Sequence, residues 1–404
     1  MTKAGSGADL YLTWKDIVTI ASVVVSGVMS YKTYKLLKEK RDFGNLPTPC
    51  SGIDELIGNT PMVLIKSLSE ATGMNIYAKL ELNNPAGSAK DRVALNIIKT
   101  AEKEGLLVRG KPGVVFEGTS GSTGISIAMI CNALGYKSYI SLPDDTSNEK
   151  LALLESLGAT LNKVKPAAII DPNQYVNAAK KACGDLNREN EDKPDELRIR
   201  GIFADQFENE SNWRAHYEAT GPEIYKQLNG NIQAFIAGCG TGGTISGVSK
   251  YLKEKIGLIN LHVVLADPQG SGFYNRINYG VMYDTVEKEG TRRRHQVDTI
   301  VEGIGLNRIT NNFSKGEHLI DESIRVNDEQ AIKMAKFLSV NDGLFIGSST
   351  AINAVAAVIL SKNMKPNSNI VIIACDSGSR HLSKFWKSAV AIDSEVSLDE
   401  IMKS

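Results

Sequence analysis

Short apolar segments alternate with longer helical patterns over most of this 404-residue chain. Strands are predicted at Ile76–Leu82, Gly113–Phe116, Ser138–Leu142, Gln233–Ala237, His262–Ala266 and Ile370–Ala374. Helices are predicted in the same alternating pattern at Val93–Leu106, Ile125–Ala133, Asn148–Leu157 and Ile245–Lys255. This alternation is typical of βαβ units, in which crossover helices cover the faces of a parallel sheet. With 42% hydrophobic residues, the chain can form two or three such domains.

An uncharged run from Ile17 to Tyr31 precedes the α/β body. As a helix it spans about 22 Å, short of a hydrocarbon core of about 30 Å, so the span must extend back to Leu10. Basic residues follow it at once: Lys32, Lys35, Lys38, Lys40 and Arg41. We therefore predict a membrane anchor with its basic flank at residues 1–41, and the positive-inside rule puts the body on the cytoplasmic side.

Two other interpretations of this N-terminal segment were weighed against an anchor. A cleaved matrix-targeting peptide should be rich in arginine and poor in acids, yet the first arginine is Arg41, and Asp9 and Asp16 interrupt the run. The other alternative is a buried helix of a soluble protein. A short anchor flanked by lysines is typical of the mitochondrial outer membrane, which is the membrane we expect.

Composition excludes several classes of function. The 46 basic and 46 acidic residues balance, so no global field attracts nucleic acid. Five scattered cysteines without a CxxC pair indicate a reducing compartment, and five distant histidines show no metal spacing. The polar stretch Gly184–Leu197 predicts an exposed loop. The short basic run Arg292–Arg294 is interpreted as a solvated loop rather than a phosphate site.

A lysine stands where the first predicted strand gives way to a helix, in the sequence NNPAGSAKDR from Asn83 to Arg92. Ser88 and Asp91 match a capping box, which would place Lys90 in the first helical turn. The positive end of the helix disfavours the ammonium form there. Lys90 is therefore a candidate Schiff-base nucleophile, although a lysine in a first turn is more commonly a surface residue.

Two further turns between a strand and a helix are rich in glycine and hydroxyl groups. Glu117–Gly124 reads EGTSGSTG, and its free N–H groups suit a carboxylate. Gly238–Thr244 reads GCGTGGT, which suits a phosphate. The second turn also fits a rival, because GxGxxG with Asp267 ending the next strand is typical of NAD-binding folds. An NAD-dependent oxidoreductase therefore stays open from this motif alone.

A fourth polar turn, CDSGSR from Cys375 to Arg380, follows the last predicted strand. Taken in order, the motifs make the chain resemble the cysteine synthase / cystathionine β-synthase family, with its pyridoxal-phosphate fold type II. The resemblance runs from about Ile53 to Lys387. It includes the segment IGNTP at Ile57–Pro61, the lysine motif, the loop Thr119–Gly124, Gln206–Phe207, Thr220–Ile224, GTGGT, Glu302–Gly305 and Ser377. With the anchor, the chain is most similar to fungal members of the mitochondrial outer membrane.

The resemblance implies roles for particular residues. Lys90 would bind pyridoxal phosphate covalently and remove the substrate's α-proton. The cofactor phosphate would be bound by Gly240, Thr241, Gly242, Gly243 and Thr244. Ser377 would contact the pyridine nitrogen, which suits β-elimination better than transamination. The substrate carboxylate would be bound by Thr119, Ser120, Thr123 and Gln206.

The sequence also departs from the family pattern. Ser122 replaces the asparagine that normally contacts the cofactor's ring oxygen, and Gly184–Leu197 and Gly280–Gln296 resemble insertions. The chain ends soon after its core, and no histidine precedes His216. We therefore expect neither a C-terminal regulatory pair nor a haem segment, which favours a cysteine synthase over an animal-type cystathionine β-synthase.

These observations predict an α/β enzyme of fold type II with two three-layer αβα domains after one transmembrane helix. The smaller domain is expected at 84–208, and the larger combines 42–83 with 209–404. The expected activity is β-replacement, making L-cysteine from O-acetylserine or serine and sulfide, in a homodimer without bound metal. The alternatives are a cysteine desulfhydrase or other lyase, a serine–thiol β-synthase, the NAD oxidoreductase and a weakly catalytic membrane adaptor.

Overall fold

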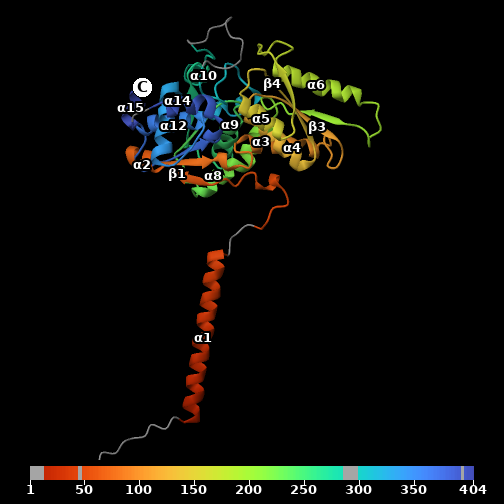
Figure 1. The fold of residues 1–404 in the computed structure, drawn as a ribbon. Coiled ribbons are helices and arrows are strands. Elements are labelled where there is room, and N and C mark those ends of the chain that lie inside the picture. The colour runs from red at the N-terminus through yellow and green to blue at the C-terminus, as the bar shows by residue number, and fades with distance from the viewer. Residues whose placement is uncertain (1–12, 44–47, 285–298, 393–394) are drawn as a thin grey trace, which may run out of the picture. The chain divides into compact units, whose positions relative to one another are not determined.

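The computed structural model describes residues 13–43, 48–284, 299–392 and 395–404, and it contains two compact units, Met1–Ser51 and Gly52–Ser404. The described helix of the first unit is α1, Trp14–Phe43 (Figure 1). Its stretch Ile17–Lys35, with mean hydropathy 1.3 and no part buried, is long and apolar enough to cross a membrane. Signal sequences and core helices can have the same length and composition, so membrane insertion stays a prediction. Leu10, to which the predicted span extends, lies outside the described residues.

The larger sheet of the second unit has six strands in the order β1-β2-β10-β7-β8-β9. Their bounds are β1 Met62–Leu64, β2 Asn75–Leu80, β7 Ala234–Gly238, β8 His262–Pro268, β9 Glu322–Val326 and β10 Asn369–Ala374. Only β1 among these runs antiparallel to its neighbour. The central strand β10 has the sequence NIVIIA and is buried at every position, as expected for a parallel strand covered on both faces.

The smaller sheet has four parallel strands in the order β5-β4-β3-β6. Their bounds are β3 Gly113–Gly118, β4 Lys137–Pro143, β5 Thr160–Val164 and β6 Arg200–Phe203. Its strands all lie between residues 113 and 203, whereas the larger sheet takes strands from both sides of that interval. The division into domains 84–208 and 42–83 plus 209–404 stays a prediction.

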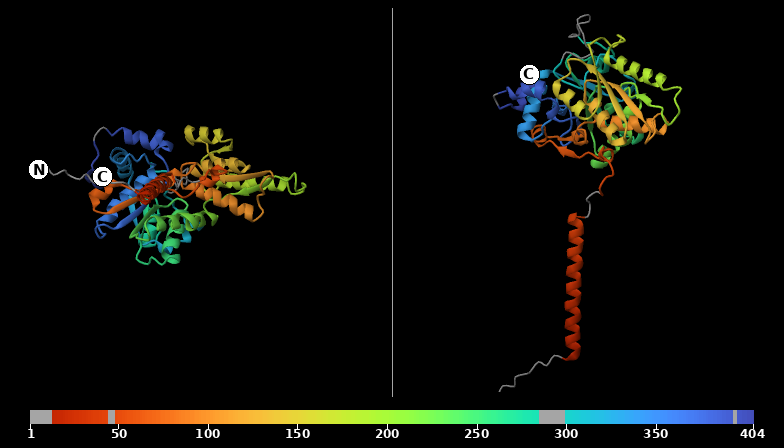
Figure 2. Two further views of the ribbon diagram at one scale, coloured as in Figure 1. Left: turned by 90° about the horizontal axis from the view of Figure 1, so that it is seen from below. Right: turned by 45° about the vertical axis from the view of Figure 1, so that its right-hand side comes forward.

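Helices cover both faces of each sheet, giving the three-layer arrangement expected for this fold class (Figures 1 and 2). One face of the larger sheet packs against α2 Lys66–Thr72, α12 Asp328–Asn341, α13 Ser348–Ser361, α14 Lys387–Val390 and α15 Leu398–Lys403. The other face packs against α8 Gly221–Gln227, α9 Gly243–Ser249, α10 Phe273–Tyr279 and α11 Asn311–Ser314. Alternate β10 residues serve the two cores, with Ile372 in the first and Ile373 in the second.

The smaller sheet carries α3 Lys90–Lys103, α4 Ser122–Leu134 and α5 Asn148–Ser156 against one core. Figure 1 shows α6 (Tyr175–Glu189) on the other side of β3 and β4. The short helix α7 (Ser211–Ala215) contacts both α3 and α9. The helices α4 and α9 follow β3 and β7 in the chain. They begin at the carboxyl ends of these strands, where ligands bind in parallel sheets.

The prediction of a loop at Gly184–Leu197 is wrong for the first part of this stretch, because α6 continues to Glu189. The Asn187 side chain donates to the carbonyl of Gly201 and accepts from its N–H, which fastens this end of the helix to β6. Residues 191–197 are exposed, as predicted. The basic run Arg292–Arg294 and most of the predicted insertion 280–296 lie outside the described residues.

Candidate active site

A cavity of about 400 Å³ opens at the carboxyl ends of strands from both sheets, beside Gly118, Pro143, Gly238 and Cys375. This volume is within the usual range for small-molecule sites. Most of the residues predicted for the site line it: Lys90, Thr119, Ser120, Ser122, Thr123, Gln206, Gly240, Thr241, Gly242 and Thr244. Two predicted residues, Gly243 and Ser377, are not among the lining residues. The roles of all twelve residues stay predictions.

Lys90 is the first residue of α3, as the sequence predicted. The preceding turn is held at both ends, because Ala89 N–H donates to the Cys375 carbonyl at 3.2 Å and Asp91 accepts from Ala86 N–H at 2.6 Å. Ser126 in α4 donates to the other Asp91 oxygen at 2.5 Å. Burial nevertheless raises the pKa of Asp91 to about 6. These bonds fix the backbone from which Lys90 enters the cavity.

The capping box predicted from Ser88 and Asp91 is wrong. The cap residue is Ala89, which has no side-chain capping bond. Ser88 Oγ accepts from Lys90 N–H at 3.2 Å, and Asp91 binds Ala86 rather than the Ser88 N–H. The turn is thus pinned by the C-terminal segment near Cys375, a tertiary contact that a local pattern does not contain.

The side chain of Gln206 holds the hydroxyl-rich loop Glu117–Gly124 in place through hydrogen bonds. Thr123 at the start of α4 donates to Gln206 Oε1 at 2.6 Å, and Gln206 Nε2 donates to Glu117 at 3.2 Å. Glu117 is fully buried, and burial raises its pKa to about 8. The Thr123 proton is therefore committed to Gln206, while Thr119 Oγ1 accepts from Gly121 N–H at 3.1 Å. The loop's remaining donors, including backbone N–H groups at the start of α4, suit a carboxylate.

The glycine-rich turn between β7 and α9 is packed too tightly for side chains. A Cβ on Gly240 would lie 2.2 Å from the Gly303 carbonyl, and one on Gly242 would lie 2.6 Å from Phe313 and require its φ of +83°. Gly243 instead faces Asn212, whose Oδ1 lies 1.9 Å from a Cβ built there. Only glycine fits these positions, and Gly240 and Gly242 line the cavity with backbone alone.

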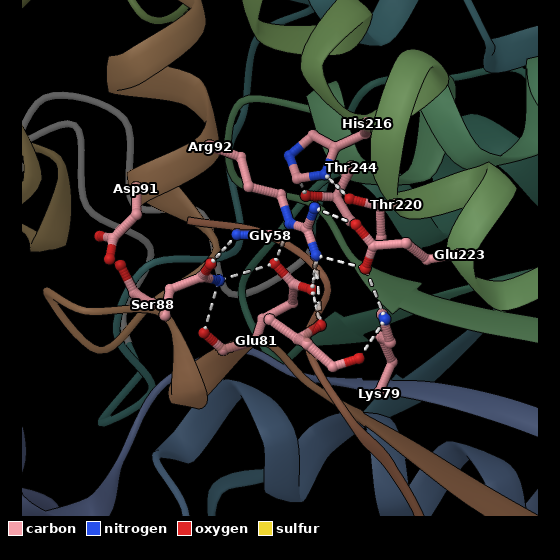
Figure 3. Close-up of polar contacts among 12 residues, drawn as sticks. Gly58, Lys79, Glu81, Ser88, Asp91, Arg92, His216, Thr220, Glu223 and Thr244 are labelled. Carbon is pink, nitrogen blue, oxygen red and sulfur yellow. Dashed lines mark hydrogen bonds and ion pairs between the residues drawn. The ribbon is translucent and has the colours of Figure 1, made fainter. Parts of the chain in front are cut away.

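His216, which the sequence did not single out, holds one hydroxyl of this turn. Its Nε2 lies 3.1 Å from Thr244 Oγ1 and its Nδ1 lies 3.0 Å from Thr220 Oγ1 (Figure 3). Burial lowers the pKa of His216 to about 3, so the ring is neutral and joins two hydroxyls as donor to one and acceptor from the other. The feature of the sequence that could have identified His216 is its position four residues before Thr220.

A buried ionic cluster lies beside α3, formed by Lys79, Glu81, Arg92 and Glu223 and called here the scaffold cluster (Figure 3). Arg92 binds both carboxylates, at 2.7 Å to Glu81 and 2.7 Å to Glu223, and Lys79 binds Glu223 at 2.6 Å. Two cations thus balance two anions. Despite burial, the ion pairs hold the pKa of Glu223 down to about 2, and that of Glu81 below its usual value.

The scaffold cluster joins the IGNTP segment to the helix of the lysine. Thr60 donates to Glu81 at 2.8 Å, and Asn59 N–H donates to Glu223 at 3.0 Å. Gly58 N–H donates to Asn84 Oδ1 at 2.9 Å, where its φ of +96° favours glycine. Because Arg92 lies two residues after Lys90, these contacts hold the first turn of the lysine helix against the scaffold cluster.

The segment after β10 presents Asp376 rather than Ser377 to the cavity. Ser377 Oγ accepts from Ser379 N–H at 3.3 Å and from the Ser379 hydroxyl at 3.0 Å. Asp376 Oδ2 lies 3.0 Å from His381 Nε2 and 3.5 Å from Ser122 Oγ. The contact of Ser377 with a ring nitrogen thus stays a prediction, and Asp376 and His381 are cavity residues that sequence reasoning passed over.

The family description "Pyridoxal-phosphate dependent enzyme" matches residues 53–376, which include Lys90, the hydroxyl-rich loop and the glycine-rich turn of the cavity. The chain belongs to the pyridoxal-phosphate-dependent enzymes. Its cofactor is pyridoxal phosphate. The resemblance identified from the ordered motifs is confirmed at this level.

Curated relatives agree with the family assignment. The chain is 72% identical to the "Putative mitochondrial cysteine synthase" of Saccharomyces cerevisiae over 402 residues, covering 100% of both chains. It is 52% identical to "Cysteine synthase 2" of Schizosaccharomyces pombe, over 91% of this chain and 92% of the relative. It is also 37% identical to the "Cystathionine beta-synthase" of S. cerevisiae, over 82% of this chain and 62% of the relative.

The cavity of this pyridoxal-phosphate enzyme fits its cofactor on structural grounds. The bare backbone at Gly240 and Gly242, with the Thr241 and Thr244 hydroxyls beside it, suits a phosphate. Lys90 lines the same cavity and has the primary amine that the aldehyde group of the cofactor requires. The residues present therefore fit pyridoxal phosphate.

The rival NAD interpretation of the same glycines does not fit. Asp267, the carboxylate that would bind a ribose, is fully buried behind α10 and accepts from Tyr274 N–H at 2.7 Å. Burial raises its pKa to about 7. Asp267 is not among the residues that line the cavity, so its carboxylate is not available to a ligand there.

Proposed function

We propose that this pyridoxal-phosphate enzyme is a cysteine synthase, which replaces the β-substituent of O-acetylserine or serine with sulfide. The observation that carries the proposal is one cavity in which Lys90, a bare glycine turn and a hydroxyl-rich loop lie together. Support also comes from the names of relatives that are 72% and 52% identical to it. Pyridoxal phosphate, when bound, supplies the electron sink that acidifies the substrate's α-hydrogen.

The residues of the chain divide the remaining work. Lys90 Nζ would hold the cofactor aldehyde, take the α-proton from the substrate and return it after the thiol adds. Gly240, Thr241, Gly242, Gly243 and Thr244 would bind the phosphate, and Gly243 also allows the close approach of Asn212. The substrate carboxylate would accept from the loop Thr119–Thr123 and from Gln206.

His216 fits the phosphate role of Thr244. If Thr244 donates its proton to the phosphate, its oxygen must accept from His216 Nε2–H at 3.1 Å. Nδ1 then accepts from Thr220 at 3.0 Å, which a neutral ring allows. A histidine that never charges at neutral pH keeps this proton arrangement fixed.

A lyase that releases sulfide from cysteine is the second candidate, and Ser122 is the observation that favours it. Ser122 Oγ lies 3.5 Å from Asp376 Oδ2, at the limit of a hydrogen bond, so it is free to turn toward a ligand. Being shorter than the asparagine of related enzymes, serine would hold the cofactor ring less firmly. The activity test separates the two candidates by their products.

The test uses the detergent-solubilised full-length protein with O-acetylserine, serine or cysteine, each with and without sulfide. A cysteine synthase forms cysteine from the first two only when sulfide is present. Release of sulfide and pyruvate from cysteine as the faster reaction would favour the lyase. No turnover by a protein that carries its cofactor would leave a membrane adaptor as the better description.

We further propose that α1 anchors the enzyme in the mitochondrial outer membrane with the body facing the cytoplasm. Support comes from the apolar stretch Ile17–Lys35 and from the mitochondrial name of a relative aligned over the whole chain. Resistance to alkaline carbonate extraction, combined with digestion of the body by protease added to intact mitochondria, tests this proposal. Release by carbonate would contradict the anchor, and protection from protease would contradict the orientation.

From the resemblance to the same family, we also propose that the protein is a homodimer and that its body is divided into two domains. Light scattering on the solubilised protein measures the first, with a monomer as the contrary result. Limited proteolysis tests the second, since domains 84–208 and 42–83 plus 209–404 should be cut near 83 and 209 before either core is digested.

A further inference from the structure

One titratable pair in the cavity has no role in the chemistry assigned so far. Asp376 and His381 both line the cavity and are 9% and 6% exposed. His381 Nε2 lies 3.0 Å from Asp376 Oδ2. Although burial raises it, the pKa of Asp376 is held below its usual value by the hydrogen bond to His381 and by the charges of Arg380 and Lys90, so the carboxylate is ionised. An ionised partner requires that Nε2 carry the proton of this bond.

The other ring nitrogen of His381 is free for chemistry. Nδ1 is buried and has no hydrogen-bond partner among the described residues. The nearest charged group is Glu302 Oε2 at 3.6 Å, which also accepts from Lys150 Nζ at 2.6 Å. A carboxylate that orients a histidine, whose second nitrogen has no hydrogen-bond partner, is the arrangement of a general acid–base group.

The charges around this ring come from several elements that meet at the cavity. Asp376 and Arg380 lie in the segment after β10, Glu302 lies in the loop before α11, and Lys150 lies in α5. Lys90 at the start of α3 acts on Asp376 through space. The Phe385 ring packs edge-on against His381, with ring centroids 6.4 Å apart.

We propose that His381, oriented by Asp376, is the acid–base group for the β-substituent, protonating a leaving hydroxyl and taking a proton from the incoming thiol. The inference rests on the proposed β-replacement and names its substrate class, because only a hydroxyl leaving group requires such an acid. Serine is then a substrate of this cavity as well as O-acetylserine. Asp376 acts through His381 and is a positioning residue.

The protons and electrons balance over one turnover. The Cβ–O bond of serine breaks with both electrons going to oxygen, and imidazolium Nδ1 of His381 gives its proton, so water leaves. Hydrogen sulfide then forms the Cβ–S bond and passes one proton to Nδ1. Lys90 Nζ takes the α-proton first and returns it last. Serine and hydrogen sulfide thus give cysteine and water without an oxidant, whereas acetate leaves O-acetylserine without a proton.

The test compares His381→Gln with wild type on both amino acids in the solubilised full-length protein. Glutamine keeps an N–H for Asp376 but cannot transfer a proton. Loss of a positioned acid costs about 100-fold or more, so kcat for serine should fall by at least that factor. The kcat for O-acetylserine should fall less than about 10-fold, because acetate needs no acid and sulfide supplied as the hydrosulfide anion needs no base.

A second readout does not depend on turnover. The chain has five histidines, so ring ¹⁵N spectra can be assigned by substitution. The neutral His381 ring should carry its proton on Nε2, and Asp376→Asn should release this preference and slow serine by about 10-fold or more. His318→Gln is the matched control, since His318 is exposed and pairs with Glu254 at 3.0 Å.

The outcomes separate this inference from the proposed function. Equal losses on both amino acids in His381→Gln, or a neutral wild-type ring whose single proton lies on Nδ1, would overturn the inference. Wild-type turnover of O-acetylserine without any turnover of serine would overturn it and leave the cysteine synthase intact. Turnover of neither would overturn both. Circular dichroism and the visible absorption of bound cofactor check that each variant is folded, and Asp376→Asn carries the test should His381→Gln not fold.

Discussion

The protein has two groups of buried charges, the scaffold cluster and the Asp376–His381 pair of the cavity, and they differ in how completely they are paired. In the scaffold cluster, Arg92 binds Glu81 and Glu223 at 2.7 Å each, and Lys79 completes the charge balance. In the cavity, Asp376 Oδ1 and His381 Nδ1 have no hydrogen-bond partner among the described residues. Unpaired buried polar atoms are costly, and a role in catalysis is one physical reason for their presence.

The comparison teaches which charges hold the fold and which do chemistry. A fully paired cluster is a poor acid or base, because its ion pairs fix the protonation of each member. An incompletely paired group remains able to gain or lose a proton and to accept a ligand. The helix α3 connects the two, since its first residue Lys90 faces the cavity and Arg92 belongs to the scaffold cluster.

The largest expected effect comes from Lys90→Ala, which removes the reactive amine and leaves the scaffold cluster untouched. Synthesis of cysteine should fall to the detection limit, and the visible absorption of lysine-bound cofactor should disappear. The free energy of unfolding without cofactor should change by less than about 1 kcal/mol, as for most substitutions away from packed or paired groups. Wild-type absorption and rate in this variant would contradict the assignment of Lys90.

Arg92→Met tests the structural side of the comparison. It leaves Glu81 buried without its partner, which should cost about 3–5 kcal/mol of unfolding free energy in denaturant titrations. Arg188→Met is the matched control, because the Arg188 side chain is 75% exposed beside Asp185 and its pair should contribute less than about 1 kcal/mol. Similar losses in both variants would show that the scaffold cluster does not hold the fold.

Glu117 and Glu223 sharpen the comparison through pH. The pKa of Glu223 is lowered to about 2, so its stabilisation is present above the unfolded value of 4.5 and is lost as pH falls toward 2. The pKa of Glu117 is raised to about 8, so its contribution is present below 4.5 and is lost as pH rises through 8. Stability falls with pH in that range because the folded state binds one more proton.

Glu117→Gln should remove the Glu117 part of this alkaline loss. Between pH 5.5 and 7.5, the unfolding free energy of wild type should decline more steeply than that of the variant by about 1.4 kcal/mol per pH unit. Denaturant titrations at several pH values measure both slopes. Parallel slopes would mean that Glu117 is ionised in the folded protein.

Ser122→Asn has the smallest expected effect. It changes the residue whose hydroxyl lies 3.5 Å from Asp376 in the cavity. Asparagine should add a hydrogen bond to the cofactor ring worth about 0.5–1.5 kcal/mol. The ratio of cysteine synthesis to pyruvate release from O-acetylserine should therefore rise by roughly threefold to tenfold. Measuring both products with and without sulfide gives this ratio, and no change would remove the main reason for keeping the lyase as a candidate.

The sequence alone was sufficient for the fold class and the cofactor. Continuous apolar strands such as β10 and helices that begin at glycine-rich turns are local patterns, and they predicted parallel sheets with ligands at the strand carboxyl ends. The motif order led to the family that the match over residues 53–376 then showed. The extension of α6 to Glu189 was missed, because the contact of Asn187 with Gly201 that fastens it is not local.

Only the tertiary structure decided how the charged groups are paired. Arg92 meets Glu223 across 131 positions of sequence, and Ser122 meets Asp376 across 254, so no spacing rule connects them. Asp376 and His381 are five residues apart, but whether such a pair is exposed, paired or open to a cavity depends on burial by other elements. Protonation follows from that burial and pairing, which the folded chain alone determines.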